Sequence, residues 1–141
     1  MDDYRLIFPM FAMFLLTLST LMRLFRVRSK FVSEGKIDVD FFKTYQQGSE
    51  PEKAAQLARH FANLYEAPVL FYVCCLAALA TGITGTIFFL LACLYVCARV
   101  VHTYIHTGSN EIWPRVYAYF SSWLVLLCMW VVLVYRVAYP A

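Results

Sequence analysis

The chain has 141 residues, of which 62% are hydrophobic and only 15% are charged. A soluble domain of this length could not bury so much apolar surface, so the composition excludes an ordinary soluble globular protein and indicates an integral membrane protein. The net charge is +3, and most of the basic residues lie between the first two apolar segments. A cytoplasmic membrane loop explains this cluster better than nucleic-acid binding does, so we expect no nucleic-acid partner.

Four apolar segments, each long enough to cross a bilayer as a helix, follow one another along the chain. They cover approximately residues 6–24, 62–80, 84–103 and 116–137. The segments lack the alternation of apolar and polar residues that a membrane β-barrel requires. We therefore predict an all-α fold, in which residues 1–141 form a single integral membrane domain with an up-down-up-down four-helix bundle.

The second helix is expected to begin near residue 50, well before its apolar part. Ser49 and Glu52 form the S-x-x-E capping pattern, and Pro51 suits the first turn of a helix. Pro68 lies inside the same helical pattern and removes one backbone donor, so we predict a kink over residues 64–68.

The connections between the helices indicate how the bundle is oriented. The segment TGITG, residues 81–85, is short and uncharged, which predicts a tight hairpin between the second and third helices. In the third connection, Gly108 suits a helix C-cap and Pro114 suits the first turn of the next helix. Because the first and third connections carry the basic residues, we expect both on the cytoplasmic side, with both termini outside; in a bacterium this would be the inner membrane.

Two polar stripes run along single faces of the second and third helices, and an arginine opens the fourth helix. The residues are Arg59, Asn63 and Glu66 at spacing i, i+4, i+7, Arg99, His102 and His106 at spacing i, i+3, i+7, and Arg115. In the predicted topology all of them lie near the cytoplasmic end of the bundle. The sequence therefore predicts a polar site at that depth.

Ionisable groups at membrane depth cost roughly 2.5–3.5 kcal/mol each on insertion, so they persist where they pair or line a wet cavity. In one interpretation, Glu66 neutralises Arg59 or Arg99 and holds the helices together. However, the arginines outnumber this single acid, which suits a ligand with two carboxylates and one ammonium group. Arginine binds carboxylates in bidentate fashion, whereas Glu66 would take the ammonium and Asn63 a backbone amide. Glutathione is such a ligand.

The segment RHFANLYEAP, residues 59–68, has the form R-x3-N-x2-E-x-P and resembles the MAPEG family, the membrane-associated proteins in eicosanoid and glutathione metabolism. The segment RVVHTYIHTG, residues 99–108, followed by Arg115, is similar to the corresponding region of the prostaglandin E synthase and microsomal glutathione transferase branch. The four-helix hydropathy pattern extends the resemblance over nearly the whole chain.

The resemblance implies a homotrimer that binds glutathione, as co-substrate, between neighbouring subunits near the cytoplasmic face. It implies that Arg59, Asn63 and Glu66 contact glutathione and that Arg99 and His102 shape the site. Arg115 would stabilise the glutathione thiolate or act on the substrate beside it. Either Arg26 or Arg28, at the end of the first helix, would add a carboxylate contact.

One position departs from the family pattern. His106 stands where the eukaryotic enzymes carry a tyrosine that stacks on the ligand or hydrogen-bonds to it. Because histidine can also donate a hydrogen bond, we count His106 with Arg115 as a catalytic candidate.

Two classes of function follow from these residues. The first is a glutathione-dependent membrane transferase or peroxidase that acts on lipophilic electrophiles, small molecules that enter from the lipid bilayer. The alternative is a non-catalytic scaffold or accessory subunit with the same fold.

A metal centre is a further alternative, because His102 and His106 are spaced i, i+4 and Glu66 or Cys97 could complete a ligand set. No H-E-x-x-H or C-x-x-C motif supports it, so we predict no metal. All five cysteines lie in apolar segments and are interpreted as small buried hydrophobic residues.

Overall fold

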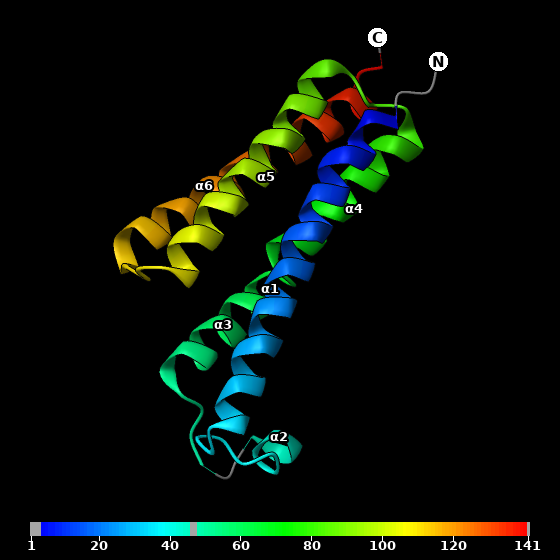
Figure 1. Cartoon of the computed structure of the whole chain (residues 1–141). Helices are drawn as coiled ribbons and strands as arrows, with labels where there is room; N and C mark the ends of the chain where they lie inside the picture. Colours follow the sequence, from blue (N-terminus) through cyan, green and yellow to red (C-terminus); the bar gives the residue numbers. More distant parts are fainter. Residues whose placement is uncertain (1–3, 46–47, 141) are drawn as a thin grey trace.

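The structure, a computed structural model, describes residues 4–45 and 48–140, and this part of the chain contains helices and no strands. In chain order the elements are the short 3-10 helix η1 (Tyr4–Leu6), α1 (Ile7–Ser33), α2 (Phe41–Thr44), α3 (Glu52–Asn63), α4 (Ala67–Thr81), α5 (Thr86–Thr107) and α6 (Ile112–Ala138). Figure 1 shows α3 and α4 continuing one another alongside α1, while α5 and α6 form a helical hairpin.

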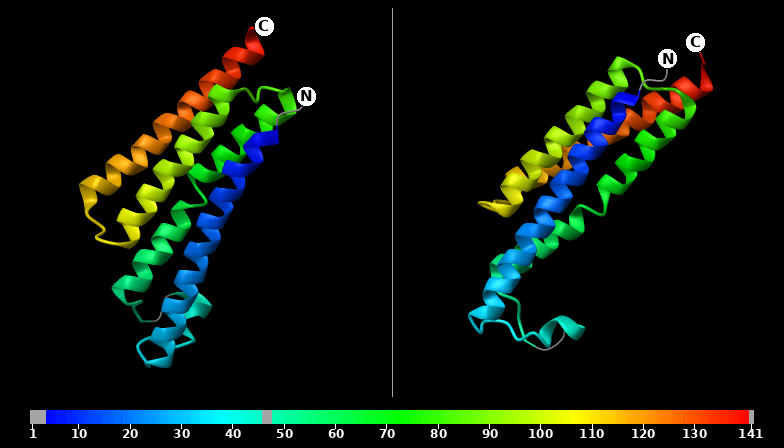
Figure 2. Two further views of the ribbon diagram at one scale, coloured as in Figure 1. Left: turned by 45° about the horizontal axis from the view of Figure 1, so that its top comes forward. Right: turned by 45° about the vertical axis from the view of Figure 1, so that its right-hand side comes forward.

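The predicted all-α four-helix bundle is confirmed. Within the described residues, four helical segments are long and apolar enough to cross a membrane: 4–33, 52–81, 86–107 and 112–138. Figures 1 and 2 show both chain ends and the α4–α5 connection together at one end of the bundle. The α1–α3 connection and the α5–α6 turn lie at the other end, so the four segments alternate in direction.

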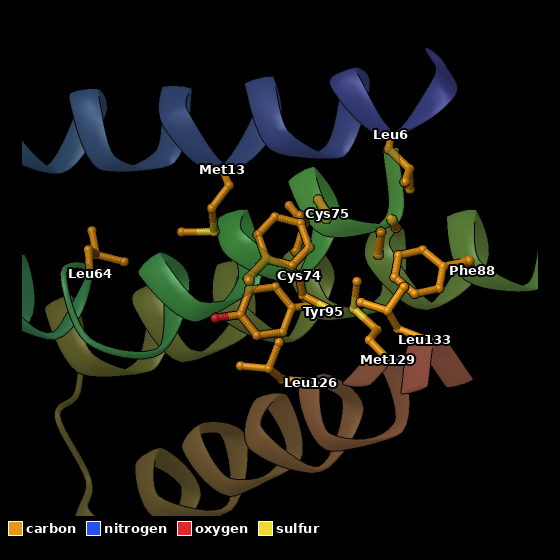
Figure 3. Packing of buried hydrophobic residues seen from close by; sticks show 14 residues of the cluster. Leu6, Met13, Leu64, Cys74, Cys75, Phe88, Tyr95, Leu126, Met129 and Leu133 are labelled. Carbon is orange, nitrogen blue, oxygen red and sulfur yellow. The ribbon is translucent and has the colours of Figure 1, made fainter. Parts of the chain in front are cut away.

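The apolar core lies in the half of the bundle that is nearer the chain ends. Met13 of α1, Phe71 of α4, Tyr95 of α5 and Met129 of α6 are all fully buried there. Figure 3 shows this cluster between the helices. The rings of Phe71 and Tyr95 stack with their centroids 4.4 Å apart and an interplanar angle of 10°. The next turn of α5 carries Arg99, so this stack marks where the apolar core ends and the polar half begins.

The second membrane segment is broken at the position where the sequence predicts a kink. Helix α3 ends at Asn63, and α4 starts again at Ala67 with Pro68 in its first turn. Proline has no backbone N–H and its ring clashes with the carbonyl four residues earlier, which is that of Leu64. Glu66 takes a non-helical conformation, with φ −94° and ψ −100°, at the junction. The interruption is therefore larger than a kink, because the helix stops and starts again.

The predicted capping box at Ser49 is wrong. Helix α3 begins at Glu52, its N-cap is Pro51 in an extended conformation, and no side chain caps it. The Pro51 carbonyl instead accepts the backbone N–H groups of Ala54 and Ala55 at 2.9 and 3.0 Å. A residue before proline is disfavoured in the helical region, which opposes a helix that begins before Pro51.

Glu50 is held by the end of α1. Its carboxylate accepts two hydrogen bonds from the Arg28 guanidinium, from Nε at 2.7 Å and from Nη2 at 3.3 Å. The same guanidinium lies over the rings of Phe42 and Tyr45, 5.1 and 5.8 Å from their centroids. These contacts join the end of α1 to the start of α3 through the α2 segment.

The two tight connections have the residues that their backbone requires. Gly82 ends α4 in the left-handed conformation, with φ +72°. Gly108 ends α5 as predicted, and a Cβ atom there would lie 2.8 Å from the Tyr104 carbonyl oxygen, so only glycine fits. Asn110 is left-handed, with φ +54°, and Pro114 lies in the first turn of α6, also as predicted.

The Arg28–Glu50 ion pair should control how often the α1–α3 connection opens. We expect Glu50→Gln to weaken this partly buried pair by about 1 kcal/mol, which is about fivefold in local opening. The measurement is the rate of limited proteolysis within residues 34–51. Glu34→Gln is the matched control. Lys36 hydrogen-bonds to Glu34 and holds the pKa of that carboxyl below its usual value, but this pair is exposed and cleavage should stay unchanged. Equal cleavage of E50Q and wild type would contradict the assignment.

Candidate functional site

A cavity of about 440 Å³ opens between α3, α5 and α6 on the side of the α5–α6 turn. Five of the residues singled out from the sequence line it: Arg59, Asn63, His102, His106 and Arg115. The two polar stripes and the arginine that opens the fourth helix therefore meet around one space. This volume is within the range of small-molecule binding sites, about 300–1,000 Å³.

The arginines at the mouth of the cavity have no acidic partner. Arg59 is exposed, and its Nε donates only to the Ala55 carbonyl oxygen, at 3.4 Å. Arg115 donates from Nη1 to Oδ1 of Asn110 at 2.7 Å. In the described part of the chain, neither guanidinium lies within 4.0 Å of a carboxylate. Both cations are therefore available to an anionic guest.

Arg99 lies behind the cavity wall, fully buried. Its Nη2 donates to the backbone oxygen of Asn63 at 3.1 Å, and its guanidinium carbon lies 5.8 Å from the centroid of the Tyr119 ring. Asn63 is the last residue of α3, so its carbonyl has no partner within that helix and can accept this bond. The Nε and Nη1 atoms of Arg99 have no hydrogen-bond partner in the protein. Two buried donors are thus left for water or for a guest.

Glu66 lies at the α3–α4 break beside the cavity rather than in its wall. Its Oε2 accepts a hydrogen bond from the Tyr119 hydroxyl at 3.2 Å. Within the described residues it makes no ion pair with Arg59 or Arg99, so the interpretation in which it locks the helices together by neutralising an arginine finds no contact in support.

The arginines at the end of α1 are not brought to the cavity of the same chain. Arg26 is exposed and is not among the lining residues. Arg28 is occupied by Glu50 and by two aromatic rings. A role for Arg26 in ligand binding therefore stays a prediction.

His60 is a site residue that the sequence reasoning missed. It is fully buried, and its ring centroid lies 5.4 Å from that of His102 and 5.0 Å from that of His106. His102 and His106 are 5.5 Å apart, so the three imidazoles form one cluster behind and along the cavity wall. The sequence did contain a pattern that could have identified His60. It follows Gln56 by four residues, so the two form a second polar stripe on α3 beside that of Arg59.

The C-terminal end of α5 is fixed by side chains from α1 and α3. Gln56 donates to the backbone oxygen of His106 at 2.5 Å, and Lys53 donates to that of Thr107 at 2.8 Å. Arg23 of α1 donates from Nη1 to the Thr107 hydroxyl at 2.9 Å. Cations are favourable at a helix C-terminus, where the last carbonyls lack helical partners. These bonds hold His106 in place at the cavity wall.

Tyr119, also missed, connects the elements of the site. It follows Arg115 by one turn on α6 and lines the cavity. Its ring centroid lies 5.6 Å from that of His102, its face carries the Arg99 guanidinium, and its hydroxyl bonds to Glu66. The spacing of four residues from Arg115 was the signal that could have identified it.

A sequence model of the MAPEG family matches residues 6–135. The chain belongs to the MAPEG family. Comparisons with curated proteins and with solved structures returned no match. Membership and the four apolar helices together make the chain an integral membrane protein with a function related to glutathione or eicosanoids.

A metal centre or a disulfide in this MAPEG chain has little support from the geometry of the described residues. Across the described residues, no group of three or more His, Cys, Asp or Glu side chains is arranged to hold a metal ion. All five cysteines are free; Cys74 and Cys75 are buried, whereas Cys97 and Cys128 are exposed on apolar helices. The expectation that all are buried is therefore wrong for these last two, which lie on faces that lipid can cover.

Arg99 should lower the stability of the MAPEG chain when no guest is bound. Because Arg99 buries a charge with two unpartnered donors, we expect Arg99→Met to raise the free energy of unfolding by about 1–4 kcal/mol. The measurement is the midpoint of thermal unfolding in detergent. Arg26→Met, which changes an exposed arginine, is the control and should shift stability by less than about 0.5 kcal/mol. A lower midpoint for R99M would show that the bond to Asn63 outweighs the burial of charge.

Proposed function

We propose that the chain binds glutathione in the arginine-lined cavity and uses it as co-substrate to attack lipophilic electrophiles, as a transferase or peroxidase. The observation that supports this best is that Arg59 and Arg115 line one cavity, with Arg99 buried behind its wall, and that none of the three has a carboxylate partner among the described residues. An anionic ligand would neutralise the unpaired positive charge of these arginines. Because the chain belongs to the MAPEG family, we propose that this ligand is glutathione.

The donors and acceptors at the site match the groups of glutathione. One carboxylate would take the guanidinium group of Arg59 at the mouth, whose planar fork favours a bidentate contact. The other would be attracted by the positive charge of Arg99 behind the cavity wall. Its ammonium group would approach Glu66, which now bonds only to the Tyr119 hydroxyl. Asn63 offers a side-chain amide at the wall for the peptide backbone, and His102 shapes the same wall.

Arg115 is the best placed residue to activate the thiol. Only its Nη1 is used, by Asn110, so the remaining donors of the guanidinium are free for a sulfur atom. A nearby cation lowers the pKa of a thiol and raises the fraction that is thiolate, which is the nucleophile. His106, on the same wall, would donate a further hydrogen bond.

The electrophile would come from the lipid bilayer. Next to Arg115, the apolar face of α6 presents Trp113, Tyr117 and Phe120, each more than 60% exposed. In a membrane such a face contacts lipid, so hydrophobic molecules that partition into the bilayer meet the cavity mouth directly. This supports lipophilic small molecules, rather than water-soluble ones, as the second substrate.

We further propose a homotrimer of the prostaglandin E synthase and glutathione transferase-like branch, with the α1–α3 and α5–α6 connections in the cytoplasm. The family resemblance supports the trimer, and the basic residues of the first connection support the orientation. Light scattering of the purified protein should give three chains per particle. A phosphatase fused at the C-terminus should be active only outside the cytoplasm. A monomer, or an inactive fusion, would contradict the respective proposal.

The decisive test combines binding with turnover. At 100 times its dissociation constant, glutathione should stabilise the wild type by about 2.7 kcal/mol in a thermal-shift assay. Arg115→Ala should lower turnover of a lipophilic electrophile by about 10²-fold or more, because it removes charge stabilisation of the thiolate. Arg136→Ala, which changes an exposed arginine in the last turn of α6, is the control.

Each failure of this test has a distinct meaning. A flat thermal response would favour the alternative of a non-catalytic accessory subunit. Binding without turnover in wild type and R115A alike would exclude the enzymatic role.

A further inference from the structure

All three histidines of the chain lie in the cluster described above, although they come from two helices. His60 of α3 is fully buried, and His102 and His106 of α5 are 1% and 5% exposed. The latter two line the cavity, whereas His60 lies behind them. The Nδ1 atom of every one of the three rings is buried without a hydrogen-bond partner in the protein. The three imidazole rings therefore share one site, and each has a nitrogen atom without a hydrogen-bond partner in the protein.

The hydrogen bonds of Thr103 determine which nitrogen of His60 carries the proton. The Thr103 hydroxyl donates its single hydrogen to the backbone oxygen of Arg99, at 2.8 Å. His60 Nε2 lies 3.0 Å from the same hydroxyl oxygen, so His60 must be the donor in this contact. A neutral His60 is therefore protonated on Nε2 and keeps an unshared electron pair on Nδ1. This makes His60 a buried base in contact with two rings at the cavity wall.

Positive charge surrounds the cluster on every side. Arg59 and Arg115 line the same cavity as His102 and His106, and Arg99 lies one turn before His102 on α5. Arg23 of α1 bonds to Thr107, the neighbour of His106. Glu66 at the α3–α4 break is the nearby acid, and it reaches the site through the Tyr119 hydroxyl. Positive charge therefore predominates around the empty cavity. A guest that brings negative charge into the cavity reverses this balance.

We propose that the histidine cluster accepts the thiol proton of the bound guest, so that the thiolate forms without releasing a proton to the solvent. This inference rests on the proposed function. In this step the S–H bond breaks, its electron pair stays on sulfur, and an N–H bond forms on His102 or His106. His60 stabilises the resulting imidazolium from behind with its free Nδ1. The product is a thiolate–imidazolium pair beside Arg115, of the kind that activates cysteine nucleophiles.

The proton has a defined destination at the end of the reaction. When a thiolate adds to an activated alkene, a carbon–sulfur bond forms and the neighbouring carbon becomes a carbanion that needs a proton. The imidazolium supplies it, and the cluster returns to its neutral state. The same side chains therefore act first as base and then as acid, and the cycle needs no further reactant.

The test follows the thiolate and the proton separately in full-length protein in detergent. Glutathione is added to weakly buffered protein near neutral pH, with thiolate read by its ultraviolet absorbance and released protons read by a pH indicator. The imidazole nitrogen NMR signals of histidine-labelled protein report the cluster directly, because the chain has no other histidine. S-methylglutathione, which has no thiol proton, is the matched control ligand.

We expect thiolate absorbance with almost no proton release, together with an imidazolium signal that S-methylglutathione does not produce. In His60→Gln, which can still donate to Thr103 but has no ring nitrogen to stabilise the imidazolium, we expect less thiolate and more protons released for each thiolate that forms. The wild-type measurements decide the question even if this variant fails to fold.

Two results would overturn the inference in different ways. Thiolate formation with about one proton released per site and unchanged imidazole signals would exclude the histidines as acceptor, while the proposed function would stand. Failure of both glutathione and S-methylglutathione to bind, measured by thermal shift on the same preparation, would remove the proposed function and this inference together.

Discussion

The helix break that gives the buried guanidinium of Arg99 its backbone acceptor is the constraint on which the polar half of the bundle depends. A charge at this depth needs a backbone acceptor, and the break between α3 and α4 provides one, because the carbonyl of Asn63 has no partner in its own helix. Pro68 enforces that break by preventing a continuous helix. One proline therefore supplies both an acceptor for the arginine of α5 and a junction at which Glu66 leaves the helix. An uninterrupted second segment would offer neither.

The cavity is built on helices that are fixed at both ends of the site. At one end, the Phe71–Tyr95 stack packs α4 against α5. At the other, Lys53 and Gln56 of α3 bond to the last carbonyls of α5. The side chains that face the cavity therefore stand on rigid elements, as a site that must position a thiol requires. The arginines at the mouth, by contrast, are left without acidic partners and can adjust to a guest.

Much of this arrangement was predictable because it depends on local patterns. Hydropathy located the four helices, Pro68 located the break, and helical spacing placed the stripes of Arg59 and Arg99 on one face each. The parts that were missed depend on packing between distant segments. His60 follows Arg59 directly in the sequence but points toward α5. Tyr119 lies in an apolar segment of a kind that is typical of lipid-facing helices. The capping box failed for a related reason: Ser49 and Glu52 have the right spacing, but Pro51 restricts the backbone between them and Glu50 is held by Arg28.

The stacked rings of Phe71 and Tyr95 also have a consequence for the membrane itself. A cavity lined by two arginines and two histidines favours water, and a water-filled path through the whole bilayer would let ions cross it. Phe71 and Tyr95 are both fully buried, and Tyr95 lies one helical turn before Arg99, so stacked aromatic rings adjoin the polar half of the bundle. Packed apolar side chains at this position oppose the passage of charged groups toward the other end of the bundle.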